Sequence, residues 1–144
     1  MFAPKKILVP VDLSEYSAKA ISYGADLARL TNASLTVLTV VNDVLPVFEF
    51  FPIDARTADF LPGIEENSAR ELQTLIGKHA TGVGADAAVE RGYPANQIVG
   101  HAKRGNFDLI VMATHGHTGL EHALLGSITE KVLRKAHCPV LVVR

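Results

Sequence analysis

The stretch that decides the fold runs Leu109-Ile110-Val111-Met112-Ala113, and Thr114-His115-Gly116-His117-Thr118-Gly119 follows it directly. Five consecutive apolar residues predict a short strand that is buried on both faces, as in a parallel sheet. Glycines after such a strand permit backbone angles and close approaches that other residues resist. Parallel sheets of α/β proteins bind ligands outside the carboxyl ends of their strands, so this junction is the first candidate for a site.

Strand-like and helix-like segments alternate on both sides of this junction. Short runs rich in apolar residues and threonine predict strands at residues 7–11, 34–41, 87–90, 109–113 and 140–143. Apolar residues at helical spacing predict four helices, at about residues 18–30, 64–79, 94–104 and 128–136. Pro94 suits the first turn of the third helix, and Gly105 stands where its C′ residue is expected. The order predicts one doubly wound, Rossmann-like α/β domain over residues 1–144, with a five-stranded parallel sheet and helices on both faces.

Length, charge and cysteine content argue against nucleic-acid binding, membrane insertion and an internal disulfide. The chain has 144 residues and a net charge of −1, so no basic surface is expected to attract nucleic acid or anionic membranes. No apolar run reaches the roughly 18 residues that a membrane span needs. The single cysteine, Cys138, cannot form an internal disulfide, and a packed thiol is expected there. We therefore expect a cytoplasmic protein with no nucleic-acid partner and no membrane insertion.

The loop after residue 113 has the features of a phosphate site. Gly116, Gly119 and Gly126 would let consecutive backbone N–H groups converge on an anion. Gly126-Ser127 at the start of the last helix would add unpaired N–H groups, the positive end of the helix dipole and a hydroxyl. A loop whose glycines serve only tight turns explains the spacing equally well. Spacing alone therefore leaves both interpretations open.

The chain resembles the universal stress protein family. Ala113-x2-Gly116-x9-Gly126-Ser127 matches the family's nucleotide signature, G-x2-G-x9-G-[ST], except at its first position. The resemblance extends over residues 7–15 and 137–143 and covers essentially the whole chain. It implies a strand order of 3-2-1-4-5, ATP as the ligand together with Mg²⁺, and a homodimer joined through Val140–Val143.

The resemblance also implies which residues surround the nucleotide. Pro10, Asp12 and Val40 would border the adenosine, and Asp12 would approach a magnesium ion through water. The ribose and phosphates would be bordered by Met112, Gly116, Gly126, Ser127 and Ile128. Ala113, His117 and Gly119 complete the candidate set. Ala113 departs from the family's glycine, and we expect the strand to continue through it with negative φ and only its N–H to be used.

Metal binding, catalysis and an adaptor function are the weaker hypotheses for this chain. His115, His117 and His122 would line or cap the phosphate site rather than hold zinc, since loop residues give no geometry that converges them. No catalytic residue and no metal ligand is assigned, so we expect a stress-response or signalling module that acts through ATP occupancy. Slow ATP hydrolysis or self-phosphorylation stays open. The rival is a dimeric adaptor protein that binds no nucleotide and uses Phe48–Phe51, within the irregular stretch Asn42–Pro62, to contact an unknown partner.

Overall fold

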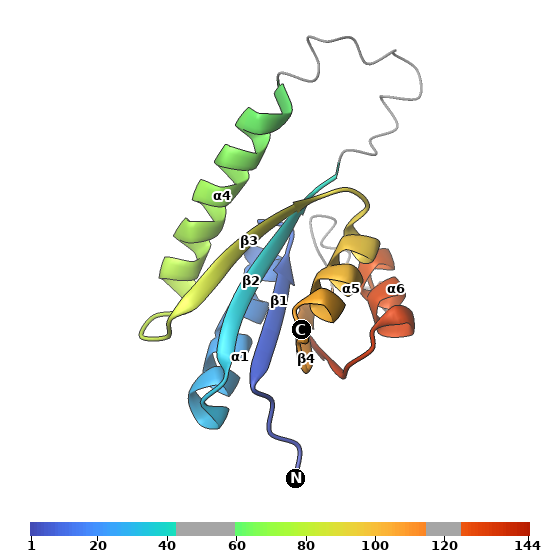
Figure 1. Ribbon diagram of the computed structural model, residues 1–144. Helices are drawn as coiled ribbons and strands as arrows, with labels where there is room; N and C mark the ends of the chain where they lie inside the picture. The colour runs from blue at the N-terminus through green and yellow to red at the C-terminus, as the bar shows by residue number, and fades with distance from the viewer. Residues whose placement is uncertain (43–59, 115–124) are drawn as a thin grey trace.

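The structure is a computed structural model that describes residues 1–42, 60–114 and 125–144. Strands and helices alternate along the chain, as Figure 1 shows. In chain order the elements are β1 (Lys6–Val11), α1 (Glu15–Thr31), β2 (Ser34–Val41), α4 (Phe60–His79), β3 (Ala85–Arg91), α5 (Pro94–Arg104), β4 (Leu109–Ala113), α6 (Ser127–Lys135) and β5 (Val140–Val143).

The five strands form a parallel sheet in the order β3-β2-β1-β4-β5. This order and the four helices confirm the predicted fold. β1 leads through α1 to β2 on one side, whereas β4 lies on its other side, so the strand order reverses between β1 and β4. In sheets of this kind the crevice at the reversal is where ligands bind.

Helices cover both faces of the sheet, and alternate strand residues serve opposite faces. Ile7 and Val9 of β1 pack with α1 and α4, while Leu8 packs with α5 and α6. All three of these side chains are fully buried. α1 lies so close to the sheet that a Cβ at Gly24 would stand 2.6 Å from Val9 Cγ2, which explains a glycine within this helix.

The bounds of α4 and β3 differ from the prediction by a few residues. α4 begins at Phe60, inside the stretch 42–62 that was expected to be irregular. Pro62 is accommodated because it falls in the first helical turn, where its missing N–H has no intrahelical partner to lose. Residues 43–59, among them Phe48–Phe51, lie outside the described residues. β3 is longer than predicted, since it runs from Ala85 to Arg91 rather than over 87–90 alone.

The end of α5 differs from the prediction by one residue. Gly105 is the C-cap in a right-handed conformation, with φ of −83°. The left-handed residue is Asn106, with φ of 51°, which asparagine tolerates better than most residues. Gly105 is needed for space instead, because a Cβ there would lie 2.4 Å from Cε2 of Phe107. In the described part of the chain, no helix combines the length and apolar character required to cross a membrane.

Candidate functional site

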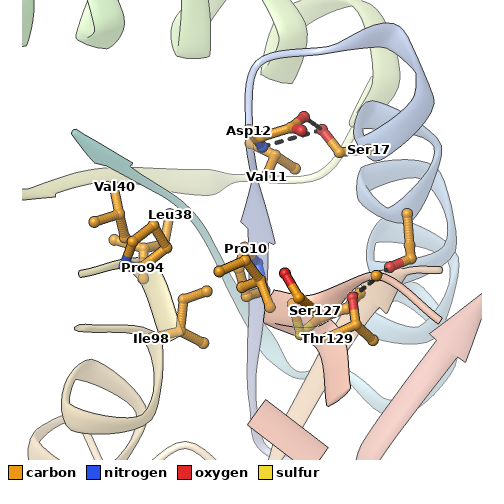
Figure 2. A pocket seen from close by; sticks show the side chains of 14 residues that line it. Pro10, Val11, Asp12, Ser17, Leu38, Val40, Pro94, Ile98, Ser127 and Thr129 are labelled. Atoms are coloured by element: carbon orange, nitrogen blue, oxygen red, sulfur yellow. Dashed lines mark hydrogen bonds between the residues drawn. The ribbon is translucent and has the colours of Figure 1, made fainter. Parts of the chain in front are cut away.

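A cavity of about 270 Å³ opens where the strand order reverses, at the carboxyl ends of β1 and β4 (Figure 2). β1, β2, β4, α1, α5 and α6 all contribute to its wall. The residues that line it are Pro10, Val11, Asp12, Ser17, Leu38, Val40, Pro94, Ile98, Met112, Ala113, Gly126, Ser127, Ile128 and Thr129.

The cavity brings together every predicted site residue that the structure describes. They come from four separate segments of the chain: Pro10 and Asp12, Val40, Met112 and Ala113, and Gly126, Ser127 and Ile128. The predicted residues Gly116, His117 and Gly119 lie outside the described residues, as do His115 and His122.

Asp12 stands at the end of β1 with its carboxylate held by α1. Its Oδ1 accepts hydrogen bonds from Ser14 N–H at 3.1 Å, from the Ser14 hydroxyl, and from Ser17 Oγ at 2.6 Å. The Asp12 N–H donates to Ser17 Oγ at 3.1 Å (Figure 2). Three donors therefore converge on one oxygen of this carboxylate, which lies at one corner of the cavity.

The start of α6 forms the opposite corner. Its N-cap is Gly126, which supplies no side chain to cap the first N–H groups of the helix. By contrast, α1 is capped by its own Ser14, whose Oγ accepts from Ser17 N–H at 3.1 Å. A helix start whose N-cap residue has no side chain, with its positive dipole end, is suited to an anion. The Gly126 N–H donates to Thr114 O at 2.7 Å. An anion would therefore be bound by the backbone N–H groups of the residues after Gly126.

Ala113 is the last residue of β4, paired with Val143 of β5. In the described residues the non-glycine positions with positive φ are Leu13, Asn32 and Asn106, so Ala113 keeps ordinary strand geometry as expected. Its carbonyl accepts a hydrogen bond from the buried Thr129 Oγ1 at 3.0 Å, which ties α6 to the end of β4.

The wall between these corners is apolar, and much of it was not predicted. Leu38 of β2 and Pro94 and Ile98 of α5 lie together at one end of the cavity, beside Val40 (Figure 2). Nothing in the spacing of α5 distinguishes its start from that of any other amphipathic helix. Val11, Ser17 and Thr129 were also missed, although Val11 lies between the predicted residues Pro10 and Asp12, and Thr129 directly follows the predicted Ile128.

The arrangement can hold a ligand with an apolar flat part and an anionic part. The apolar end would take the first, and the start of α6 the second. Within the residues the structure describes, no group of three or more His, Cys, Asp or Glu side chains could hold a metal ion by itself. Cys138 lies elsewhere and is half-buried; burial and then the charge of Asp108 raise the pKa of its thiol, as expected of an unreactive one.

Comparison with known proteins identifies the family. The model of the universal stress protein family matches residues 4–144. The chain belongs to the universal stress protein family. It is 38% identical to a universal stress protein of Methanocaldococcus jannaschii, with 97% of this chain and 82% of that protein covered. It is 34% identical to the universal stress protein YxiE of Bacillus subtilis, with 96% and 98% covered.

Solved structures of this family share the fold. The structure of a second universal stress protein of M. jannaschii superposes with a TM-score of 0.80 at 29% identity and covers 99% of this chain and 96% of that one. Two more distant members were solved with nucleotides: one in complex with cAMP, at 22% identity and a TM-score of 0.64, and one from Archaeoglobus fulgidus in complex with dAMP, at 19% identity and 0.62.

Proposed function

We propose that this universal stress protein binds ATP with Mg²⁺ in the cavity at the end of β1 and β4, and that ATP occupancy is its signal in a stress response. The observation that carries the proposal is the gathering of Pro10, Asp12, Val40, residues 112–113 and residues 126–128 around one cavity. The distant relatives solved with cAMP and dAMP support a nucleotide as the ligand class.

Each part of the nucleotide has a matching surface. The base would lie at the apolar end, against Leu38, Val40 and Ile98. The phosphates would meet the N–H groups at the start of α6. Mg²⁺ prefers oxygen ligands and keeps several waters, so the Asp12 carboxylate would hold it through water.

The proposal is binding rather than turnover. Among the described residues that line the cavity, the charged side chain is the Asp12 carboxylate. A carboxylate repels the negative charge of a transferring phosphoryl group, whereas phosphoryl transfer requires cationic groups to stabilise it. We therefore assign no catalytic residue.

Gly126→Asp tests the site with a change that should not harm folding. Aspartate is a preferred N-cap residue, so the variant should be as stable as the natural protein or more so. Its carboxylate would occupy the N–H groups that the phosphates need, and it would repel them. We expect Mg-ATP to bind the natural protein at micromolar strength, about −8 kcal/mol, and binding to be lost in the variant.

Calorimetry gives the affinities, and thermal unfolding gives the stability. Gly84→Asp is the matched control, because Gly84 lies in the turn before β3, has open space around it and does not line the cavity. Mass spectrometry of the purified protein shows whether nucleotide is carried along. If the natural protein neither carries nucleotide nor binds Mg-ATP, the proposal is wrong and an adaptor function is favoured.

We also propose that two copies pair through β5. This strand lies at the edge of the sheet, and its Leu141 side chain is 39% exposed. An edge strand leaves backbone N–H and C=O groups without a neighbour in the sheet, and an apolar edge favours pairing with another chain. A two-fold axis would make the contact self-complementary.

A further inference from the structure

The cavity contains a buried serine whose hydroxyl bonds to the residue at the end of β1. Ser17 lies in the first turn of α1 and is 5% exposed. Its Oγ donates to Asp12 Oδ1 at 2.6 Å and accepts from the Asp12 N–H at 3.1 Å. The same hydroxyl lies 3.1 Å from the Ser14 carbonyl and 3.2 Å from the Ser14 hydroxyl. The shortest of these contacts is the one to the Asp12 carboxylate, and the Ser17 hydroxyl bonds to both the carboxylate and the backbone of Asp12.

Capping does not account for this contact. Ser14 already caps α1, since its Oγ accepts from the Ser17 N–H. The helix would keep that cap if residue 17 were alanine. The Ser17 hydroxyl adds two hydrogen bonds between Asp12 and α1. One comes from the Asp12 N–H, and the other goes to Asp12 Oδ1.

The backbone between Asp12 and Ser17 is strained at Leu13. Leu13 has φ of 66°. The other two non-glycine residues with positive φ in the described chain are asparagines, which tolerate that conformation, whereas a bulky leucine does not. Leu13 turns the chain between Asp12 and Ser14 so that both donors of Ser14 reach Asp12 Oδ1. Strained backbone beside a ligand cavity persists when the surrounding contacts determine it.

We propose that Ser17 is a positioning residue, which holds the Asp12 carboxylate in one orientation toward the ligand in the cavity. Asp12 makes the contact to the nucleotide or its Mg²⁺, and Ser17 acts only through Asp12. A fixed carboxylate loses less conformational freedom when the ligand binds, so the ligand binds more tightly. The inference rests on the proposed function, because the ligand is the nucleotide of the preceding section.

A double-mutant cycle on Mg-ATP affinity tests the proposal. Calorimetry would compare the natural protein with Ser17→Ala, Asp12→Ala and the double variant. We expect Ser17→Ala to raise the Kd about tenfold (a change of about 1.4 kcal/mol). In the Asp12→Ala background the same substitution should change the Kd by less than about twofold, because no carboxylate is left to position.

Ser22→Ala is the matched control. Ser22 is a half-buried serine on the same helix, and its Oγ lies 3.3 Å from His79 Nδ1 of α4 rather than at the cavity. It should bind Mg-ATP like the natural protein. If Ser17→Ala does not fold, Ser17→Cys replaces it in the cycle, since a thiol fills the space but bonds weakly; a severalfold rise in Kd is then expected.

The outcomes separate this inference from the function on which it rests. If the natural protein does not bind Mg-ATP, both are wrong. If it binds and Ser17→Ala binds equally well, the role of Ser17 is wrong and the nucleotide function stands. The proposal would also be wrong if Ser17→Ala lowered Mg-ATP affinity by the same factor with and without the Asp12 carboxylate. That result would indicate a general structural role for Ser17.

Discussion

At the scale of single residues, Ala113 shows how a departure from a family signature can be absorbed. It is the last residue of β4, and it pairs with Val143 and binds Thr129 through its carbonyl. These contacts use ordinary strand geometry, for which alanine is adequate. The methyl group is nearly buried, since the residue is 9% exposed.

We expect Ala113→Gly to leave Mg-ATP affinity unchanged within about twofold and to lower the free energy of unfolding by about 0.5–1 kcal/mol, the usual cost of glycine inside a strand. Calorimetry and urea denaturation measure the two quantities. A tenfold gain in affinity would contradict this view and would mean that the natural protein is a compromised binder.

The residues of the site divide into those that a sequence can reveal and those that it cannot. Asp12 was predictable because it directly follows a recognisable strand within a segment that resembles the family, and Gly126 and Ser127 because they fit the family's signature at the start of a helix. Pro94 and Ile98 were not, since their place at the cavity depends on where α5 crosses the sheet. That position is fixed by packing, which leaves no mark in the local spacing of α5.

At the scale of elements, charged side chains tie β3 to α5. Glu90 Oε1 lies 2.8 Å from His101 Nδ1 and 3.0 Å from Arg104 Nη2. The hydrogen bond from His101, helped by the charge of Arg104, holds the pKa of Glu90 below its ordinary value despite partial burial. A lowered carboxyl pKa means that the folded protein favours the ionised form, so the contact stabilises the fold above the unfolded pKa of about 4.3.

This contact predicts a pH-dependent contribution to stability. Glu90→Gln should lower the free energy of unfolding at pH 7, by no more than about 1 kcal/mol because the groups are partly exposed. As the pH falls below about 4.3, the natural protein loses this advantage and the two proteins should converge. Urea denaturation at pH 7 and pH 3 measures the difference. Glu71→Gln, at an exposed position of α4, controls for the loss of one charge; an equal effect there would refute the assignment.

The elements themselves were largely predictable, for physical reasons that differ between strands. β1, β4 and β5 are short apolar runs, which predict parallel strands in a chain where such runs alternate with helices; β1 and β4 are buried, whereas β5 is partly exposed at the sheet edge. β3 was underestimated because its sequence, ADAAVER, is half-exposed and weakly apolar. Its length is set by pairing with β2, where Leu35 to Val41 oppose Ala85 to Arg91.

At the scale of the whole molecule, the strand order leaves β5 at one edge of the sheet. If two copies pair there, the exposed Leu141 contributes to the contact and a charge should disrupt it. We expect Leu141→Lys to convert a dimer to a monomer at micromolar concentration without unfolding the chain, because a 39% exposed side chain tolerates lysine. Light scattering after gel filtration measures the mass.

Ile64→Lys is the control for that experiment. Ile64 is 45% exposed on α4, which packs over β2 and β3 and so lies far from β5 in the strand order. It should leave the mass unchanged. A natural protein that is monomeric, or a Leu141→Lys variant that stays dimeric, would show that β5 does not join the copies.

The hydrogen bond between Gly126 N–H and Thr114 O also makes this scaffold convenient for protein engineering. The bond joins the two ends of segment 115–125, so the chain leaves the sheet and returns to α6 at one point. Replacement segments of other lengths could be spliced between these anchors with little penalty, since doubling a flexible loop costs only about 0.6 kcal/mol. A library built at this junction would vary the chain that leads from Thr114 to the cavity residue Gly126, while the sheet and the start of α6 stay in place.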